Sequence, residues 1–365
     1  MSKIVSIATA VPRYKHDQRD ILTFMQRVYA MNETDKRKLK FLYNQSAIDT
    51  RYSVLPDYSL GAGDWEFYPA TENLEPFPDL ETRMEWYNKT AAPLSIDAIE
   101  KCIDNKLHKD EITHLITVSC TGVSAPGLDL QIMEQMDLPP SIFRTSVNFM
   151  GCYAAIHGLK LADAFCAAEP AARVLVVCTE LCTLHFQREN TTDNIASSLL
   201  FGDGAAAMLF THDANDLDGL KIKSFYSEVT FKGKKDMSWE LSSTGFLMTL
   251  SGYVPDLIEQ DFKKLLYNAL GGAGISKTDI SHWCIHPGGK RILTSIGNCI
   301  EVTPADLQHS YHVLKNYGNM SSPTILFVLK EIAESLKNNK GDKINIFGAA
   351  FGPGLTLETF ILSDD

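Results

Sequence analysis

From residue 111 to the carboxyl end, short runs of apolar and β-branched residues alternate with stretches of helical periodicity. A chain with this alternation buries its strands as a sheet and covers the sheet with helices, so we expect an α/β protein. The predicted strands are 3–8, 112–120, 141–149, 173–178, 204–210, 282–285, 343–347 and 356–362. The predicted helices are 129–136, 153–168, 256–271, 289–300 and 323–336.

The chain has 365 residues, which exceeds the usual size of one domain and favours two. No Gly/Ser linker divides it, and the best boundary is the acidic stretch near residues 215–222. We therefore predict an N-terminal half, 1–218, and a C-terminal half, 219–365. The predicted helix 153–168 is apolar nearly all round, which is typical of a buried helix.

Charge and hydropathy exclude several classes. Lys and Arg number 34 and Asp and Glu 45, a net charge of −11, which disfavours nucleic acid as a partner. No stretch approaches the roughly 18 apolar residues that a membrane span needs, so we expect no integral membrane association. The opening residues lack a signal-peptide core, and we expect a cytoplasmic protein whose eight cysteines are reduced thiols.

Cys152 stands where the predicted strand 141–149 passes into the buried helix. The positive end of a helix dipole favours a thiolate, so this position predicts a nucleophile with a lowered pKa. The alternative is that Cys152 is a small residue of the core.

A thiol nucleophile needs a proton acceptor, and His286 ends a predicted strand just before Pro287-Gly288-Gly289. It could equally be a histidine that is satisfied at a strand end. A metal shared with His282 is disfavoured, because residues four apart on a strand lie about 13 Å apart. Asn319, after Gly318, is either a helix cap or a hydrogen-bond donor to an oxyanion.

Six motifs occur along the chain in a fixed order. They are NFMGCYAA (148–155), RVLVVCTE (173–180), LFGDGAAA (200–207), HPGG (286–289), YGNMSSP (317–323) and FGPG (351–354). Together they resemble the type III polyketide synthases, the chalcone and stilbene synthase-like family, and its bacterial members most. The resemblance spans nearly the whole chain.

The resemblance implies a thiolase fold, αβαβα layers built from two similar halves, in a homodimer. It implies a catalytic trio of Cys152, His286 and Asn319 that loads an acyl-CoA starter and extends it with malonyl-CoA. The product would close to a pyrone, resorcinol or phloroglucinol-type ring. No metal or redox cofactor is implied, since the CoA thioesters are substrates.

The resemblance also assigns residues to the cavity and to CoA. Bulky His185 and Trp239 stand where chalcone-forming members have small residues, which disfavours a chalcone product. The cavity set is Cys120, His185, Phe201, Trp239, Met248, Gly352 and Pro353. The set predicted to bind CoA phosphates is Lys38, Arg51, Lys290 and Arg291.

Two alternatives remain open. One is a ketoacyl synthase III-like enzyme that makes a single extension, with acyl carrier protein as its partner. The other is an inactive partner protein with the same fold.

Overall fold

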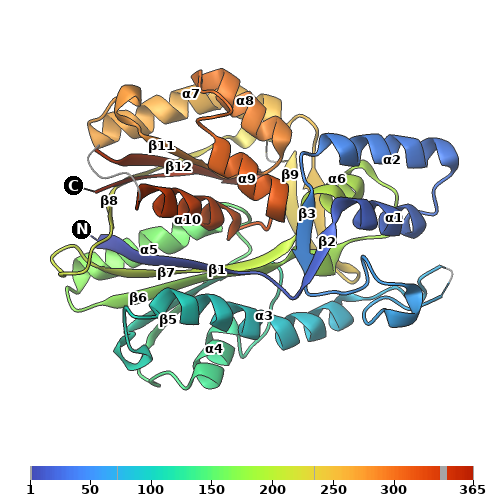
Figure 1. Cartoon of the computed structure of the whole chain (residues 1–365), viewed down its shortest axis with the longest axis horizontal. Coiled ribbons are helices and arrows are strands. Elements are labelled where there is room, and N and C mark those ends of the chain that lie inside the picture. The colour runs from blue at the N-terminus through green and yellow to red at the C-terminus, as the bar shows by residue number, and fades with distance from the viewer. Residues whose placement is uncertain (1, 72, 234, 338–342, 365) are drawn as a thin grey trace.

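A nine-stranded mixed sheet organises the chain, in the order β5-β4-β6-β7-β1-β8-β13-β12-β11 (Figure 1). The structure is a computed structural model and describes residues 2–71, 73–233, 235–337 and 343–364. The strands of the large sheet are β1 (Ser2–Ala10), β4 (His114–Ser119), β5 (Phe143–Asn148), β6 (Arg173–Leu181), β7 (Asp203–His212), β8 (Leu220–Val229), β11 (His282–Ile285), β12 (Asn345–Gly352) and β13 (Thr356–Ser363).

The sheet consists of two halves with the same connectivity. In the first half β4 is parallel to β6, and β7 is antiparallel to both β6 and β1. In the second half β11 is parallel to β12, and β13 is antiparallel to both β12 and β8. The halves meet where β1 pairs with β8 through Lys3 and Ile4. This repetition confirms the predicted thiolase-type fold, and the second half has no counterpart of the edge strand β5 among the described residues.

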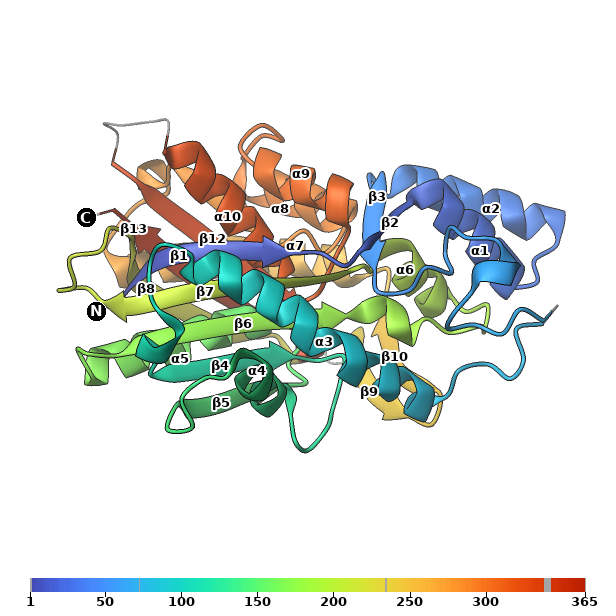
Figure 2. The same ribbon diagram turned by 60° about the horizontal axis from the view of Figure 1, so that its bottom comes forward.

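Helices complete five layers (Figures 1 and 2). α3 (Leu80–Ile103) and α4 (Leu128–Met136) cover the outer face of the first half, and α7 (Val254–Ala273) and α8 (Lys290–Ile300) cover that of the second. Between the halves lie α5 (Ala154–Ala168) and α10 (Thr324–Leu336), which follows α9 (Gln308–Tyr317). Three apolar clusters fill the spaces between these layers. The prediction of a buried α5 is therefore confirmed.

The remaining elements gather at one end of the sheet, on the right in Figure 1. They are α1 (Gln18–Val28), α2 (Glu33–Gln45), α6 (Thr192–Leu200), the paired strands β2 (Tyr14–Asp17) and β3 (Thr50–Ser53), and the hairpin of β9 (Met237–Ser242) and β10 (Gly245–Leu250). The sequence predictions missed β8, β2, β3 and β9 because polar residues interrupt their apolar runs, and they also missed β10, although GFLMTL is mostly apolar. All the predicted strands and helices are present, with ends shifted by a few residues.

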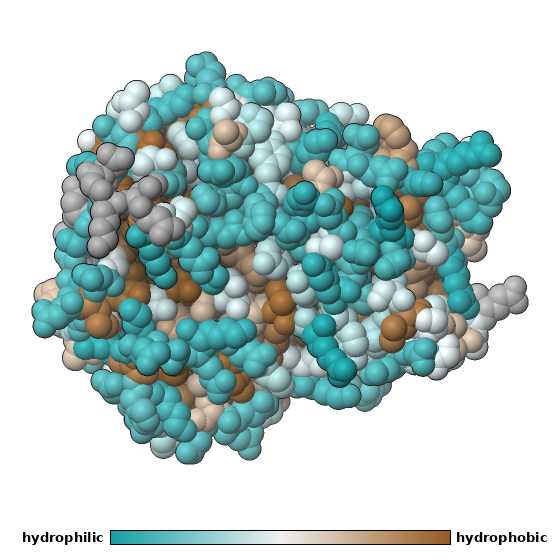
Figure 3. Space-filling view, viewed as in Figure 1, coloured by the Kyte–Doolittle hydropathy of each residue, from teal (hydrophilic) through white to brown (hydrophobic). Residues whose placement is uncertain are grey.

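The face in Figure 3 is mostly hydrophilic, with small scattered hydrophobic areas. Within the described residues, no helix combines the length and hydropathy needed to cross a bilayer.

Candidate active site

Cys152 lies in a tight turn between β5 and α5. The backbone reverses there through two left-handed residues, Phe149 at φ 59° and Gly151 at φ 80°. A Cβ atom on Gly151 would lie 2.3 Å from Cδ of Pro353, so glycine is required by the packing as well as by φ. The predicted position of Cys152, at a strand-to-helix junction, is confirmed.

His286 follows the last residue of β11, and its N–H donates to the carbonyl of Ala349 at 2.9 Å. The side chain is 1% exposed, yet neither ring nitrogen has a hydrogen-bond partner within the described structure. Buried polar atoms are normally paired, so two free nitrogens on one buried imidazole indicate a ligand site.

Asn319 is held by backbone contacts that join the two halves. Its N–H donates to Leu200 O and its carbonyl accepts from Gly202 N–H, both at 2.9 Å. The side-chain Oδ1 accepts from Ser321 N–H at 2.8 Å, which assigns Nδ2 as the donor side of the amide. Sγ of Cys152 lies 4.0 Å from Oδ1.

One cavity, with an empty volume of about 660 Å³, brings Cys152, His286 and Asn319 together. Its other walls are mainly apolar. They comprise Cys120, Thr121, Gly151, Cys182, Phe201, Met237, Trp239, Met248, Leu250, Gly288, Ile292, Ser321, Phe351 and Pro353.

The protonation of the trio differs from the prediction. Burial raises the pKa of the Cys152 thiol to about 11, and it lowers the pKa of His286 to about 3. At neutral pH the resting pair is therefore a neutral thiol and a neutral imidazole. The expected thiolate was wrong for this state, because desolvation of the thiol inside the cavity outweighs the helix dipole.

Glu180, near the end of β6, holds the cavity-lining residues Cys120 and Thr121 in place. Its carboxylate accepts hydrogen bonds from Cys120 N–H and the Thr121 hydroxyl, both at 2.8 Å, and from the Ser322 hydroxyl at 2.7 Å. Burial raises the pKa of Glu180 to about 7. No role was predicted for Glu180, although a carboxylate near the end of an otherwise apolar strand was the available signal.

The predicted cavity residues fall into three groups. Cys120, Phe201, Trp239, Met248 and Pro353 line the cavity of the trio. His185 instead lines a neighbouring cavity of about 270 Å³, which shares Cys182, Phe201, Trp239 and Met248 with the first. The backbone of Gly352 packs on the turn that carries Cys152, and a Cβ on Gly352 would lie 2.5 Å from the ring of Tyr153.

Three aromatic side chains pack together in the wall of the neighbouring cavity, and one of them, Trp239, also lines the cavity of the trio. His185 lies flat on Phe246 at 4.3 Å between centroids, and Trp239 meets both rings edge-on. The indole N–H of Trp239 donates to Cys120 O at 2.7 Å. Nε2 of His185 bonds Thr121 O at 2.8 Å, and burial lowers the pKa of this histidine to about 3. Both bulky residues are fixed in place as neutral groups.

The predicted CoA-binding residues lie in three different settings. Lys290 and Arg291 are exposed at the start of α8, next to the cavity residues Gly288 and Ile292. Lys38 is exposed on α2 and pairs with Asp35 at 3.1 Å.

The prediction that Arg51 binds a CoA phosphate is wrong. Arg51 is 1% exposed, and its guanidinium donates to Gln18 and to the carbonyl of Phe201. A Cβ on Gly318 would lie 2.8 Å from Cδ of Arg51, so this side chain supports the Asn319 loop from below. It is not available to a CoA phosphate, because the loop and the β3 strand bury it.

A buried thiol, imidazole and carboxamide that meet between the two halves of a thiolase-type fold define an acyl-transferring condensing enzyme. Comparison with known proteins identifies the family. Residues 1–214 match the N-terminal domain of chalcone and stilbene synthases, and residues 222–364 match their C-terminal domain. The chain belongs to this family, the type III polyketide synthases, and is an acyltransferase-type enzyme.

Two relatives come from bacteria. The chain is 26% identical to 3,5-dihydroxyphenylacetyl-CoA synthase of Amycolatopsis orientalis, over 99% of this chain and 93% of that protein. It is 28% identical to the alpha-pyrone synthesis polyketide synthase-like Pks18 of Mycobacterium tuberculosis, over 97% and 89%. The crystal structure of PKS-I from the brown alga Ectocarpus siliculosus superposes with a TM-score of 0.93 at 27% identity, covering 99% of this chain and 98% of that one.

Proposed function

We propose that this polyketide synthase loads an acyl-CoA starter onto Cys152 and extends it by decarboxylative condensation with malonyl-CoA. The observation that carries the proposal is the buried His286 imidazole, whose two nitrogens are unpartnered in the cavity that holds the thiol. Substrate atoms would supply those missing partners.

In the loading step, the neutral His286 imidazole accepts the thiol proton as Cys152 attacks the thioester carbonyl. The lowered pKa of His286 keeps it in the basic form that this step requires. The CoA thiolate leaves and takes the proton back from the imidazolium. The products are acyl-Cys152 and free CoA, and the charges balance.

In the extension step, malonyl-CoA loses CO₂ and leaves an enolate at its thioester oxygen. Asn319 Nδ2 and an N–H of His286 donate to that oxygen where the negative charge develops. The enolate carbon attacks acyl-Cys152, which forms a carbon–carbon bond, releases the extended chain as a CoA thioester and frees the Cys152 thiolate. The thiolate attacks that thioester, so the chain returns to Cys152 and CoA leaves, taking a proton from water. Repetition lengthens the chain by two carbons each time, and ring closure releases the product. The protein itself supplies these groups, and we propose no metal or redox cofactor.

The size of the cavity supports a short starter and few extensions. Trp239 lies between the cavity of the trio and the small neighbouring cavity, about 270 Å³, that His185 and Phe246 line. We therefore propose a small pyrone or phloroglucinol-type product over a long-chain alkylresorcinol.

The test is incubation of the purified protein with short and long acyl-CoA starters and radiolabelled malonyl-CoA. The proposal requires multiply extended, cyclised products with the short starters. A single extension that depends on acyl carrier protein would support the ketoacyl synthase III-like alternative. Intact-protein mass spectrometry that detects no acyl group on Cys152 would support an inactive partner.

We also propose a homodimer. β5 is the last strand of the sheet, most of its residues are exposed, and the Phe143 side chain is 66% exposed. An open edge strand is a template for pairing, and a second copy would cover it. Light scattering should give the dimer mass, and Phe143→Lys should shift the mass to that of the monomer. Within the cell, the eight free thiols fit our proposal of a cytoplasmic enzyme.

A further inference from the structure

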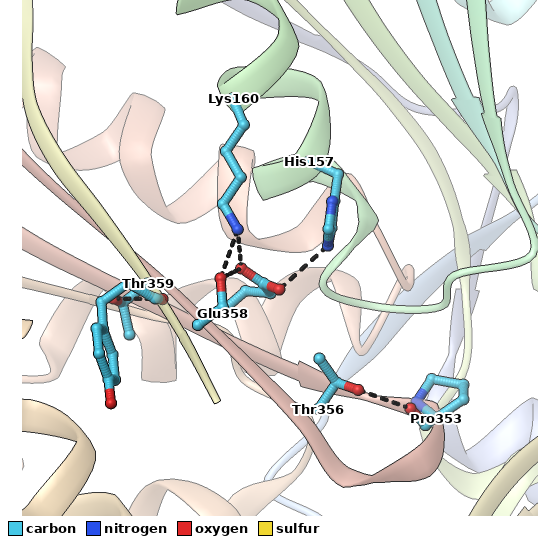
Figure 4. Close-up of polar contacts among 8 residues, drawn as sticks. His157, Lys160, Pro353, Thr356, Glu358 and Thr359 are labelled. Atoms are coloured by element: carbon cyan, nitrogen blue, oxygen red, sulfur yellow. Dashed lines mark hydrogen bonds and ion pairs between the residues drawn. The ribbon is translucent and has the colours of Figure 1, made fainter. Parts of the chain in front are cut away.

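An ionic cluster around the buried carboxylate of Glu358 lies outside the cavity, between the two halves of the fold (Figure 4). Glu358, on β13, is 3% exposed. Its carboxylate accepts from His157 Nε2 at 3.1 Å, from the Ser227 hydroxyl at 2.6 Å and from the Lys160 ammonium. Nζ of Lys160 also donates to the Ser227 hydroxyl at 2.6 Å. We refer to His157, Lys160, Ser227 and Glu358 as the Glu358 clamp.

The clamp joins elements of opposite halves. His157 and Lys160 lie on α5, which belongs to the first half, whereas Ser227 and Glu358 lie on β8 and β13 of the second. Burial alone would raise the pKa of Glu358, but the three hydrogen bonds and the charge of Lys160 hold that pKa below its ordinary value. The carboxylate is thus charged and fully paired, and loss of one partner would leave an uncompensated buried charge.

The clamp lies only a few residues along the chain from the reacting thiol and from the loop that packs against it. Cys152 precedes His157 by five residues, and Pro353 precedes Glu358 by five. The turn that carries Cys152 packs backbone to backbone against the loop after β12, which carries Pro353. A Cβ on Gly352 would lie 3.3 Å from the Cys152 nitrogen. The ring of Tyr153 lies against that of His157, with centroids 5.5 Å apart, and continues the contact to the clamp.

The geometry of the trio depends on how the halves sit together, because Cys152 belongs to the first half and His286 and Asn319 to the second. We propose that Glu358, through His157 and Lys160, is a positioning residue that sets the Cys152 turn against the Pro353 loop and so orients the thiol toward His286 and Asn319. This inference rests on the proposed role of the trio. The clamp touches no substrate and takes no part in the chemistry.

The experiment compares Lys160→Met with Lys221→Met. Lys221 is a matched control because it pairs with Asp213 at 3.5 Å, is similarly exposed, and also links the halves. Its pair lies at the opposite end of β7 from the cavity residue Phe201. Lys160→Met should lower kcat for polyketide formation about tenfold with an unchanged KM for malonyl-CoA, since misplacement of reacting groups affects the rate. Lys160→Arg should restore most of kcat, and Lys221→Met should leave it within about twofold.

A second readout needs no substrate and tests the clamp even if the proposed synthase activity is absent. Iodoacetamide at pH 9 should label Cys152 several-fold faster in Lys160→Met, because a loosened turn admits water to a thiol whose pKa is raised by burial. Cys166, buried on the same helix, should stay unlabelled, whereas global unfolding would expose both. If Lys160→Met does not fold, Ser227→Ala serves in its place, with a smaller effect of the same sign. Wild-type labelling and kcat in a folded clamp variant, or equal losses in Lys221→Met, would overturn the proposal.

Discussion

The cavity has two walls that are built in different ways. The trio wall (Cys152, His286, Asn319) is fixed by backbone: two left-handed residues near Cys152, a hydrogen bond from Asn319 N–H to Leu200 O, and one from Gly202 N–H to Asn319 O. The hairpin wall (Met237, Trp239, Met248, Leu250) comes from a separate two-stranded sheet. Side-chain hydrogen bonds attach this hairpin to the rest of the molecule, such as the one from the Trp239 indole N–H to Cys120 O. Under the proposed mechanism, we expect the trio wall to determine the reaction and the hairpin wall to determine the size of the product.

The largest effect is expected at the nucleophile, on the trio wall. Cys152→Ala should reduce polyketide formation by roughly 10⁴-fold or more, because no acyl-enzyme can form. Malonyl-CoA decarboxylation should persist, since His286 and Asn319 remain. Release of labelled CO₂ and product analysis measure the two activities, with Cys166→Ala as the control. Polyketide formation by Cys152→Ala would remove the thiol from the mechanism.

The alkylation rate of Cys152 should also vary steeply with pH. With a pKa of about 11, the thiolate fraction rises about tenfold per pH unit from pH 7 to 10, roughly 10³-fold in all. His286, with a pKa of about 3, stays neutral throughout and adds no inflection between pH 5 and 8. Iodoacetamide rates, followed by peptide mass spectrometry against free glutathione, check this. A plateau already reached at pH 6 would instead indicate a resting thiolate–imidazolium pair.

Asn319→Ala separates the two steps that the trio wall performs. Loss of one donor to the enolate oxygen should slow malonyl-CoA decarboxylation by about 10²- to 10³-fold. Loading of Cys152 should change much less, because His286 supplies the base. Mass spectrometry of the acyl-enzyme and CO₂ release give the two rates. Asn316→Ala, an asparagine of α9 outside the cavity, should leave both unchanged; equal losses in loading and decarboxylation would contradict the assignment.

Substitutions in the hairpin wall should change the product and leave the rate of decarboxylation nearly unchanged. Trp239→Ala would join the cavity of the trio to the neighbouring cavity of about 270 Å³. The expected result is a product longer by one or more two-carbon units, with decarboxylation within a few-fold of wild type. Trp239→Phe, which keeps most of the volume, should shift the product much less. Product masses decide, and an unchanged product from a folded Trp239→Ala enzyme would show that the stack does not limit chain length.

The same contrast explains which parts of the site the sequence could predict. Cys152, His286 and Asn319 stand beside glycines and prolines that demand special backbone, so their places in the fold are visible as motifs. The hairpin strands β9 and β10 carry no such signal: only Ser243 and Thr244 separate them, and this turn lacks the Asn-Gly or Asp-Gly pair that marks a hairpin in a sequence. Charged residues were least predictable. Arg51 looked available for CoA, but only the three-dimensional packing shows it buried under the Asn319 loop.

The smallest effect is expected at Lys290 and Arg291, which are exposed next to the cavity residues Gly288 and Ile292. Lys290→Ala with Arg291→Ala should raise KM for acyl-CoA about fivefold and leave kcat unchanged, because exposed charge pairs contribute roughly 0.2–1 kcal/mol each. The increase should shrink as salt is added, since salt screens exposed charges. Lys277→Ala is the control, because this lysine bonds Glu301 O at the far end of α8. A larger, salt-dependent rise in KM in Lys38→Ala would indicate that the CoA-phosphate site lies on α2 and not on α8.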